Sequence, residues 1–446
     1  MRRTRARKIA RSGAGAAALL LVGGALFNVA AMSKPHTPSR EARVDRSAQR
    51  LLAQGRQVFR FETFGDESFW SGTLKLDKAV EGSKHGGVGP GLTPKQALGA
   101  GLKVDSTALP APVVKAIKAG KVDLNDPATT LALLKLNAVV GLRAHFKGNR
   151  MTSLGITCAV CHSTVDNSFT KGIGKRLDGW PNRDLNVGAI VSLSPNLKPV
   201  ADTLGTDVDT VKKVLAAWGP GKFDAELFLD GKGFRPDGQT AAVLIPPAFG
   251  LAGVNLHTYT GWGNVPYWNA FVANLEMHGQ GNFTDTRLDD ANKFPVAARN
   301  HLGHTRHAKD LVSSKLPALH FYQMALRAPK APRKSFNHAA AARGKAVFMG
   351  QGKCASCHMP PTYSDSGFNM HKPSEICTDS FQADRSPDGM YRTTPLRGLW
   401  SHAKGGFYHD GRFQSLGDVV DHYDSCFGLH LTPQQKSDLV QYLKSL

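Results

Sequence analysis

The sequence predicts a mainly α-helical protein with two similar domains, of which the first carries a large insertion. Each half holds a Cys-x-x-Cys-His unit, one ending at His162 and the other at His358. The stretches LLAQGRQVF and AAARGKAVF precede these units and share a Gly-basic-x-Val-Phe core. Duplication of one helical unit is the simplest explanation of paired motifs in similar surroundings.

The first 31 residues predict a secretory signal peptide. MRRTRARKIAR holds six basic and no acidic side chains, and an apolar or small stretch follows from Gly13 to Ala31. Small residues at Val29 and Ala31 suit cleavage by a signal peptidase, so we expect export to the periplasm. The alternative is an uncleaved membrane anchor, because the apolar stretch approaches the length that spans a bilayer.

The composition is that of a globular protein with two or three domains. Hydrophobic residues make up 41% of the 446 residues and charged residues 20%, which excludes a disordered or multi-span membrane chain. The formal net charge of +21 falls to +15 without the signal segment. This charge favours acidic partner proteins or an anionic membrane surface. We expect no nucleic acid partner, because the basic residues are scattered and the protein is expected to be exported.

The first domain is expected at 32–330 and contains an inserted lobe at about 60–150. In the second half the cysteines follow soon after Phe348, whereas in the first half they begin only at Cys158. The intervening stretch TTLALLKLNAVVGL predicts a helix within the inserted lobe.

The two Cys-x-x-Cys-His units predict covalently bound haem. Two thiols at this spacing can add to the two vinyl groups of one haem, and the adjacent histidine then binds the iron. A thioredoxin-like pair would need a βαβ context, and a zinc site would need four ligands close together. We therefore expect two haem c groups, attached through Cys158, Cys161, Cys354 and Cys357, with His162 and His358 as proximal iron ligands.

The second domain, at 331–446, is expected to be a small cytochrome c domain. A helix is predicted from about His338, broken at Gly350, before the haem cysteines. Thr432 and Pro433 then suit the N-cap and first turn of a closing helix that packs on it. The fold class is therefore mainly α, with two cytochrome c-like haem domains.

The segment 301–335 is interpreted as a linker between the domains. Its residues His301, His304 and His307 could bind a metal, but a solvated loop is favoured because no acidic or cysteine partner accompanies them.

Two cysteines, Cys377 and Cys426, lie outside the Cys-x-x-Cys-His units. We expect a disulfide between them, because an exported protein meets an oxidising compartment.

The C-terminal third resembles a known family. YRTTPLRGLW, GGFYHDGRFQSLGDVVDHY and LTPQQKSDLVQYLKSL are similar to sequences of the bacterial di-haem cytochrome c peroxidases, a family that includes the MauG-type enzymes. The resemblance covers about 335–446 well and hardly reaches the inserted lobe. It implies two facing haem domains, one relaying electrons and one reacting with peroxide. It also implies that His409 and Arg412 lie close to the second haem or its propionates.

The sixth iron ligands decide the chemistry, because a haem with two protein ligands transfers electrons and one with an open position binds peroxide. The resemblance places Tyr423 where the family has a Met or Tyr ligand of the second haem. His371 is a further candidate, and packing within a helix is the alternative for Tyr423. Met277 and His278 are the candidates for the first haem.

Peroxide chemistry also needs an acid–base group beside the iron. Glu276, His257 and Asp184 are conceivable, and the spacing selects none of them. Trp180 could conduct electrons between the haems, although packing in a core is the commoner role of a tryptophan.

Three functions remain open. The first is a peroxidase that reduces hydrogen peroxide with electrons relayed between the haems, supplied by a small redox protein or a quinol-linked donor. The second is a non-enzymatic periplasmic electron carrier. The third is a MauG-like or oxygenase-like oxidation of a larger substrate, for which the inserted lobe could form a pocket.

Overall fold

The computed structural model describes residues 39–446, so the signal peptide expected at 1–31 lies outside the described part of the chain. Residues Ser47–Leu446 form one compact unit. Within residues 39–446, no helix combines the length and the apolar character that crossing a membrane requires.

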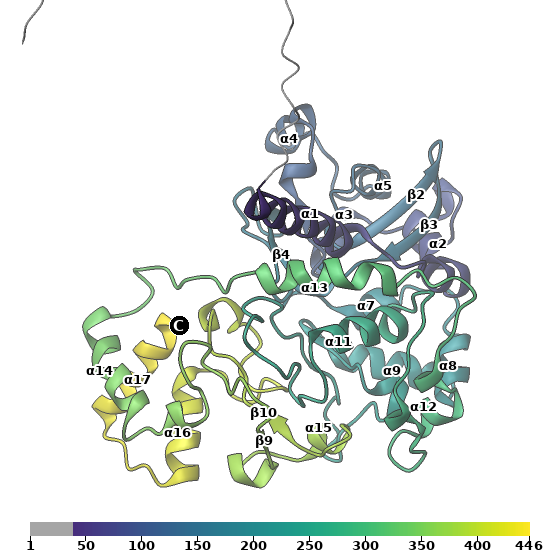
Figure 1. The fold of residues 1–446 in the computed structure, drawn as a ribbon. Helices are drawn as coiled ribbons and strands as arrows, with labels where there is room; N and C mark the ends of the chain where they lie inside the picture. The colour runs from purple at the N-terminus through teal and green to yellow at the C-terminus, as the bar shows by residue number, and fades with distance from the viewer. Residues whose placement is uncertain (1–38) are drawn as a thin grey trace, which may run out of the picture. The chain divides into compact units, whose positions relative to one another are not determined.

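The fold is mainly α-helical, as the sequence predicts (Figure 1). The helices are α1 (Arg40–Phe61), α2 (Leu76–Glu81), α3 (Pro94–Gly99), α4 (Ala111–Lys118), α5 (Pro127–Lys135), α6 (Ala159–His162), α7 (Val187–Val191), α8 (Lys198–Leu204), α9 (Val208–Trp218), α10 (Leu227–Asp230), α11 (Val265–Phe271), α12 (Pro295–Arg299), α13 (Leu316–Ala325), α14 (His338–Met349), α15 (Phe381–Asp384), α16 (Leu416–Phe427) and α17 (Pro433–Ser445).

The strands are short and pair in twos. They are β1 (Val104–Asp105), β2 (Leu142–Lys147), β3 (Arg150–Ile156), β4 (Ser163–Val165), β5 (Ile173–Gly174), β6 (Arg176–Asp178), β7 (Lys222–Phe223), β8 (Val243–Leu244), β9 (Met370–His371) and β10 (Tyr391–Arg392). β1 and β5 are parallel, and the pairs β2–β3, β4–β6, β7–β8 and β9–β10 are antiparallel.

The helix predicted for TTLALLKLNAVVGL is only partly correct. Asp126 caps α5 through its side chain, and the helix ends at Lys135. Asn137 and Gly141 then have φ angles of +51° and +81°, which a continuing α-helix does not allow. The remaining residues lead instead into the β2–β3 hairpin, which delivers the chain to the first Cys-x-x-Cys-His unit.

The two helices predicted near the C-terminus are confirmed. Asn337 caps α14, which begins at His338, and Thr432 caps α17 in a capping box with Gln435. The two helices pack on each other, and Phe348 of α14 meets Tyr442 of α17 with ring centroids 5.2 Å apart.

The interpretation of 301–335 as a linker is wrong for residues 316–325, which form α13. α13 packs on α1 as α17 packs on α14. Phe59 of α1 is fully buried and meets Tyr322 of α13 with ring centroids 5.7 Å apart. The shared Gly-basic-x-Val-Phe core therefore packs on a partner helix in each half of the chain.

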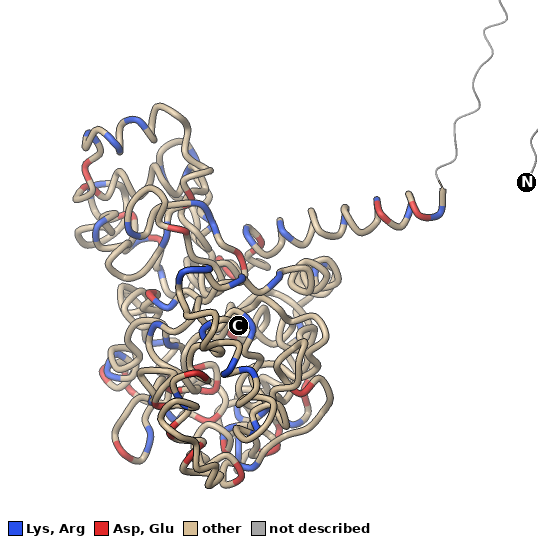
Figure 2. Tube along the Cα trace, turned by 90° about the vertical axis from the view of Figure 1, so that its left-hand side faces the viewer, with Lys and Arg blue, Asp and Glu red and all other residues tan. Residues whose placement is uncertain are grey.

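The loops TYTGWGNVPYW in the first half and AKGGFYHDGRF in the second are also similar in structure. Antiparallel bridges join His257 to Gly263 in the first half and Phe407 to Phe413 in the second. Within these loops, Thr258 and Tyr408 both have positive φ angles. A helix follows each loop. Lys and Arg are spread along the described chain rather than gathered in one stripe (Figure 2).

Candidate functional site

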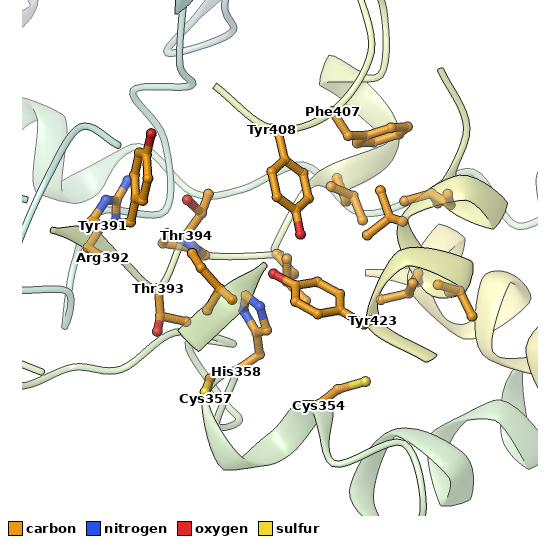
Figure 3. A pocket seen from close by; sticks show the side chains of 18 of the residues that line it. Cys354, Cys357, His358, Tyr391, Arg392, Thr393, Thr394, Phe407, Tyr408 and Tyr423 are labelled. Atoms are coloured by element: carbon orange, nitrogen blue, oxygen red, sulfur yellow. The ribbon is translucent and has the colours of Figure 1, made fainter. Parts of the chain in front are cut away.

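The second Cys-x-x-Cys-His unit opens onto a cavity of about 470 Å³ (Figure 3). α14 stops before Gly350, and the chain turns through η8 (Cys354–Ser356). Cys354, Cys357 and His358 line the cavity with a mainly apolar set of side chains. The volume lies within the range of about 300–1,000 Å³ that is usual for small-molecule and cofactor pockets.

His358 is held as an iron-binding histidine is usually held. Its Nδ1 lies 3.1 Å from the carbonyl oxygen of Tyr363, which leaves Nε2 as the ring nitrogen available to a metal. Burial lowers the pKa of His358 to about 4, so its imidazole is neutral near pH 7. Burial also raises the pKa of the Cys354 thiol to about 11. Two thiols, a neutral oriented imidazole and an apolar cavity fit a covalently attached haem.

Two arginines at the same cavity, one buried and one half-buried, are not singled out by the sequence analysis. Arg183 and Arg392 line it, and Arg183 Nε and Arg392 Nη1 have no hydrogen-bond partner among the described residues. Burial lowers the pKa of both groups, that of Arg392 to about 10. Each guanidinium also donates to a backbone carbonyl, Arg183 to Lys404 and Arg392 to Thr258, but no carboxylate among the described residues pairs with either. Because a buried charge without a counter-charge is unfavourable, these groups suit an anionic ligand group such as a haem propionate. In the sequence, the feature that could indicate Arg392 is the YRTTPLRGLW motif, which contains it.

Tyr423 faces the second unit from α16. Figure 3 shows the hydroxyl groups of Tyr408 and Tyr423 pointing toward each other, on the side of the cavity where the ring of His358 stands. Burial raises the pKa of both phenols. Tyr423 also stacks on Phe427, with ring centroids 5.5 Å apart. Tyr408 has a φ of +67°, an uncommon backbone conformation for a bulky residue that often marks a functional site.

His371 also lines the cavity, but its ring already has a partner. Its Nε2 lies 2.9 Å from Thr393 Oγ1. His422, next to Tyr423, has Nε2 3.2 Å from the carbonyl oxygen of Ile376. Tyr423 is therefore the better placed of the candidate ligands for the second haem.

His409 and Arg412 occupy different places. His409 lines the cavity, is 3% exposed and stacks on Tyr391 with ring centroids 5.2 Å apart. Arg412 hydrogen-bonds Asp379 and lies 2.7 Å from Asp410. It therefore supports the loop that carries His409.

The first Cys-x-x-Cys-His unit holds its histidine in the same way. His162 ends α6, and its Nδ1 lies 3.1 Å from the carbonyl oxygen of Pro246, which leaves Nε2 available. Burial lowers the pKa of His162 to about 4, and it raises those of Cys158 and Cys161. These residues also fit a covalently attached haem.

The first unit's candidate distal residues lie on η4 (Val272–Glu276) and just after it. Met277 is buried in the hydrophobic cluster that Cys158 contacts. His278 stacks on Phe69 with ring centroids 3.6 Å apart, beside a cavity of about 50 Å³. This cavity alone is too small for a haem, so the fit at the first unit rests on its thiols and imidazole.

Glu276 is one of the acidic residues that the structure places near the first unit, together with Asp66 and Glu62. It lines the small cavity with His278, and its charge raises the pKa of the Cys161 thiol, after the larger effect of burial. Both of its carboxyl oxygens are buried without a hydrogen-bond partner among the described residues. Burial first, and then the carboxylates of Glu226 and Asp224, raise the pKa of Glu276 well above its usual value.

The other proposed acid–base residues are engaged elsewhere. Asp184 pairs with Lys103 and Lys404. His257 has Nε2 3.0 Å from the carbonyl oxygen of Val254. Among the described residues, neither side chain makes a recorded hydrogen bond or ion pair with His162 or His358.

Trp180 lies between the first unit and the large cavity. Gly179, just before it, donates its N–H to the carbonyl oxygen of His162 over 2.8 Å. The ring of Trp180 meets Trp400 edge-on, with centroids 5.4 Å apart, and Phe249 at 6.3 Å. Phe249 lines the cavity of about 470 Å³. Trp180 thus follows a residue that is hydrogen-bonded to the first unit, and its ring contacts an aromatic side chain of the cavity wall.

The three histidines of 301–307 do not gather at a metal site. His304 has Nε2 2.8 Å from a carboxylate oxygen of Asp289, and both side chains are exposed. The expectation that no acidic group accompanies these histidines is wrong, because the fold brings Asp289 against His304. The sequence around the histidines does not indicate this contact.

The structure joins Cys377 and Cys426 in a disulfide. This bond links the segment after η9 (Pro373–Ile376) to α16, the helix that carries Tyr423. Ile376 and Thr378 both line the large cavity, so the disulfide lies in its wall.

Comparisons with known proteins found partial structural similarity. No family model and no curated protein matches the chain. Over about half of its length it is similar to a MauG-like protein associated with microbial copper homeostasis, at 17% identity over 52% of this chain and 78% of that one, with a TM-score of 0.28. It is also similar to a variant of the diheme peroxidase BthA from Burkholderia thailandensis, at 15% identity over 51% and 78%, with a TM-score of 0.30.

A third similar structure is hydrazine synthase from Kuenenia stuttgartiensis, at 19% identity over 50% of this chain and 86% of that one, with a TM-score of 0.27. The first two names belong to the family that the sequence resembles. The TM-scores lie below 0.5, so these similarities carry no conclusion about activity.

Proposed function

We propose that the chain is an exported di-haem c-type oxidoreductase that reduces hydrogen peroxide with electrons relayed between its two haems. The observation that supports it best is the pair of matching histidines. His162 and His358 each follow two cysteines, and each holds Nδ1 against a backbone carbonyl oxygen at 3.1 Å. Bound haem would supply the iron that exchanges electrons and binds peroxide.

In this proposal the site of His358 transfers electrons. Tyr423 would be the sixth ligand, because its hydroxyl points to the side of the cavity where His358 stands. Arg183 and Arg392 would hold the propionates with their unpartnered guanidinium nitrogens. Trp180 would connect this site to the first through its contacts with Trp400 and Phe249.

Peroxide would react at the site of His162. Glu276 is the proposed acid–base residue, because its buried carboxyl group has no partner among the described residues and its raised pKa favours the protonated form. It can therefore give a proton to the leaving oxygen of peroxide and recover it afterwards. The electrons would come from a small redox protein or a quinol-linked donor, and the basic surface would suit an acidic partner or an anionic membrane.

A non-enzymatic electron carrier is the second candidate. Met277 favours it, because its side chain is 3% exposed within the cluster that Cys158 contacts and could occupy the sixth position of the first haem. With Tyr423 at the second haem, both irons would then be six-coordinate and closed to peroxide.

A peroxidase assay with a reduced small cytochrome as donor separates the two candidates. The peroxidase proposal expects turnover, and it expects Glu276→Gln to lower kcat by about 10²–10⁴-fold while leaving both haems attached. Zero turnover after pre-reduction, with a ferric spectrum that cyanide and peroxide leave unchanged, would establish the carrier instead. A pyridine haemochrome equivalent to fewer than two haems per chain would contradict both.

A further inference from the structure

Another cavity, of about 320 Å³, lies among α3, α4 and α5, in the part of the chain that the sequence predicts as an insertion. Its volume also falls within the range of about 300–1,000 Å³ that is usual for ligand pockets. Apolar side chains form nearly all of its wall, among them Leu92, Leu98, Leu102, Val113, Ile117 and Leu133. The cavity thus suits a molecule that is mostly apolar.

Helix α4 forms one side of this cavity and leaves apolar surface available. Val113, Val114 and Ile117 pack against the core from α4, yet no residue of this helix is buried. Val113 and Ile117 line the cavity and stay half-buried. A ligand that covered them would gain about 25 cal/mol for each Å² of apolar surface removed from water.

The polar groups of the cavity wall indicate an uncharged ligand. Lys103 is the charged residue that lines it, and its ammonium group is paired with Asp184. The hydroxyl of Thr129 is also satisfied, since it donates to the carbonyl oxygen of Asp123 over 2.8 Å. A charged ligand would therefore find no counter-charge here, and burying it would be costly.

One lining residue, Thr130, carries a side-chain oxygen without a partner in the described part of the chain. Thr130 is 4% exposed, and its Oγ1 has no hydrogen-bond partner among the described residues. Buried hydroxyl groups are usually hydrogen-bonded, so an unpartnered one on a cavity wall indicates a missing partner. A hydroxyl can donate and accept, and one oxygen atom on the ligand would satisfy it.

The cavity shares a wall with the first Cys-x-x-Cys-His unit. Val139 and Leu142 line it, and Gly141 between them lies against Val160, the residue before Cys161. A Cβ at Gly141 would stand 2.2 Å from the Cα of Val160. A single chain segment therefore separates the cavity from the unit.

We propose that this cavity binds a neutral, largely apolar small molecule that carries one oxygen, of which an alkylphenol is the simplest type, and that Thr130 makes the hydrogen bond to that oxygen. The apolar wall supplies most of the affinity, and Thr130 selects the oxygen-bearing molecule over its hydrocarbon analogue. Binding at this site does not depend on the haem function proposed above.

Calorimetric titration of the haem-loaded full chain with 4-propylphenol and with propylbenzene tests the proposal. Thr130→Val keeps the shape of the side chain and removes its hydroxyl. It should therefore weaken the affinity for 4-propylphenol about 3- to 10-fold, the usual effect of one hydrogen bond. Propylbenzene should bind the variant as well as it binds the wild-type chain. Thr130→Ser should restore the affinity for 4-propylphenol.

Two variants that fill the cavity locate the binding site. Ala97→Leu from α3 and Val113→Phe from α4 both add volume at lining positions, so each should abolish binding while the far-UV circular dichroism stays unchanged. If neither compound bound, or if both filled variants bound like the wild type, the cavity would not be a ligand site. Equal losses for both compounds in Thr130→Val would overturn the role of Thr130.

Discussion

Gly344 of α14 lies against Asp438 of α17, where a Cβ would stand 2.0 Å from the backbone carbonyl oxygen. Gly55 of α1 has the same relation to Ala318 of α13, at 1.9 Å. Real Cβ atoms do not approach so closely, and only glycine lets the two backbones touch. The duplicated sequence core therefore encodes a helix crossing that the two halves share.

Replacing either glycine should disrupt this crossing. Gly344→Ala and Gly55→Ala should each lower the free energy of unfolding by about 1–3 kcal/mol, the usual cost of overpacking. Urea unfolding followed by circular dichroism measures the change. Gly99→Ala is the matched control, because a Cβ there meets nothing within 4 Å. If Gly344→Ala were as stable as Gly99→Ala, the contact would not matter for stability.

Features that depend on neighbouring residues could be predicted from the sequence. The caps at Asn337 and Thr432 and the thiols of the two Cys-x-x-Cys-His units are local signals, and the helices appear where they are predicted. By contrast, the segment that forms α13 lies in the stretch 301–335, which the sequence predicts as a linker. Its identity depends on packing against Gly55 and Phe59, which lie more than 200 residues earlier.

The buried charges could not be predicted for the same reason. Arg183 and Arg392 come from distant segments, and nothing near either residue indicates that both reach one cavity. The pairing of His304 with Asp289 likewise arises only when two loops meet. Sequence spacing thus predicts His162 and His358 as iron ligands but not the charges that surround them.

Arg385 connects α15 to the first half of the chain through a buried ion cluster. Its Nε lies 2.7 Å from a carboxylate oxygen of Asp230, and its Nη2 lies 3.0 Å from a carboxylate oxygen of Asp224. All three side chains are fully buried. Arg385→Met should lower the free energy of unfolding by about 3–5 kcal/mol at pH 7, because two carboxylates lose their counter-charge. Arg385→Lys keeps the charge and should cost less.

The loss of unfolding free energy in Arg385→Met should depend on pH. Burial already raises the pKa of Asp224, and removal of the guanidinium removes the main effect that opposes this shift. The folded variant would then bind more protons than its unfolded state, so its stability would fall as pH rises. Urea unfolding at pH 5 and pH 7 should therefore show a smaller deficit at pH 5. An equal deficit at both values would mean that the carboxylates are not the cause.

Tyr423→Phe tests the proposed ligand of the second haem. Phenylalanine keeps the stacking on Phe427 and removes the oxygen that would bind the iron. The ferric spectrum should gain a high-spin component, and cyanide should bind one more iron than in the wild-type chain. Tyr442→Phe is the control, since its hydroxyl lies 2.9 Å from that of Tyr363. Identical spectra for wild type and Tyr423→Phe would assign the ligand elsewhere.

Trp180→Phe tests whether the aromatic contacts carry electrons between the two sites. The smaller ring keeps an apolar side chain beside Phe249 and weakens the edge-on contact with Trp400, so electron transfer between the haems should slow severalfold. Stopped-flow reduction of one haem, followed at the absorbance of the other, measures this rate. Trp268→Phe is the control, because Trp268 is a tryptophan that packs in a separate aromatic cluster. The haem spectra and the haem attachment should be the same in both variants, so a change in rate reports on the aromatic contacts. A rate unchanged by Trp180→Phe would mean that Trp180 only packs.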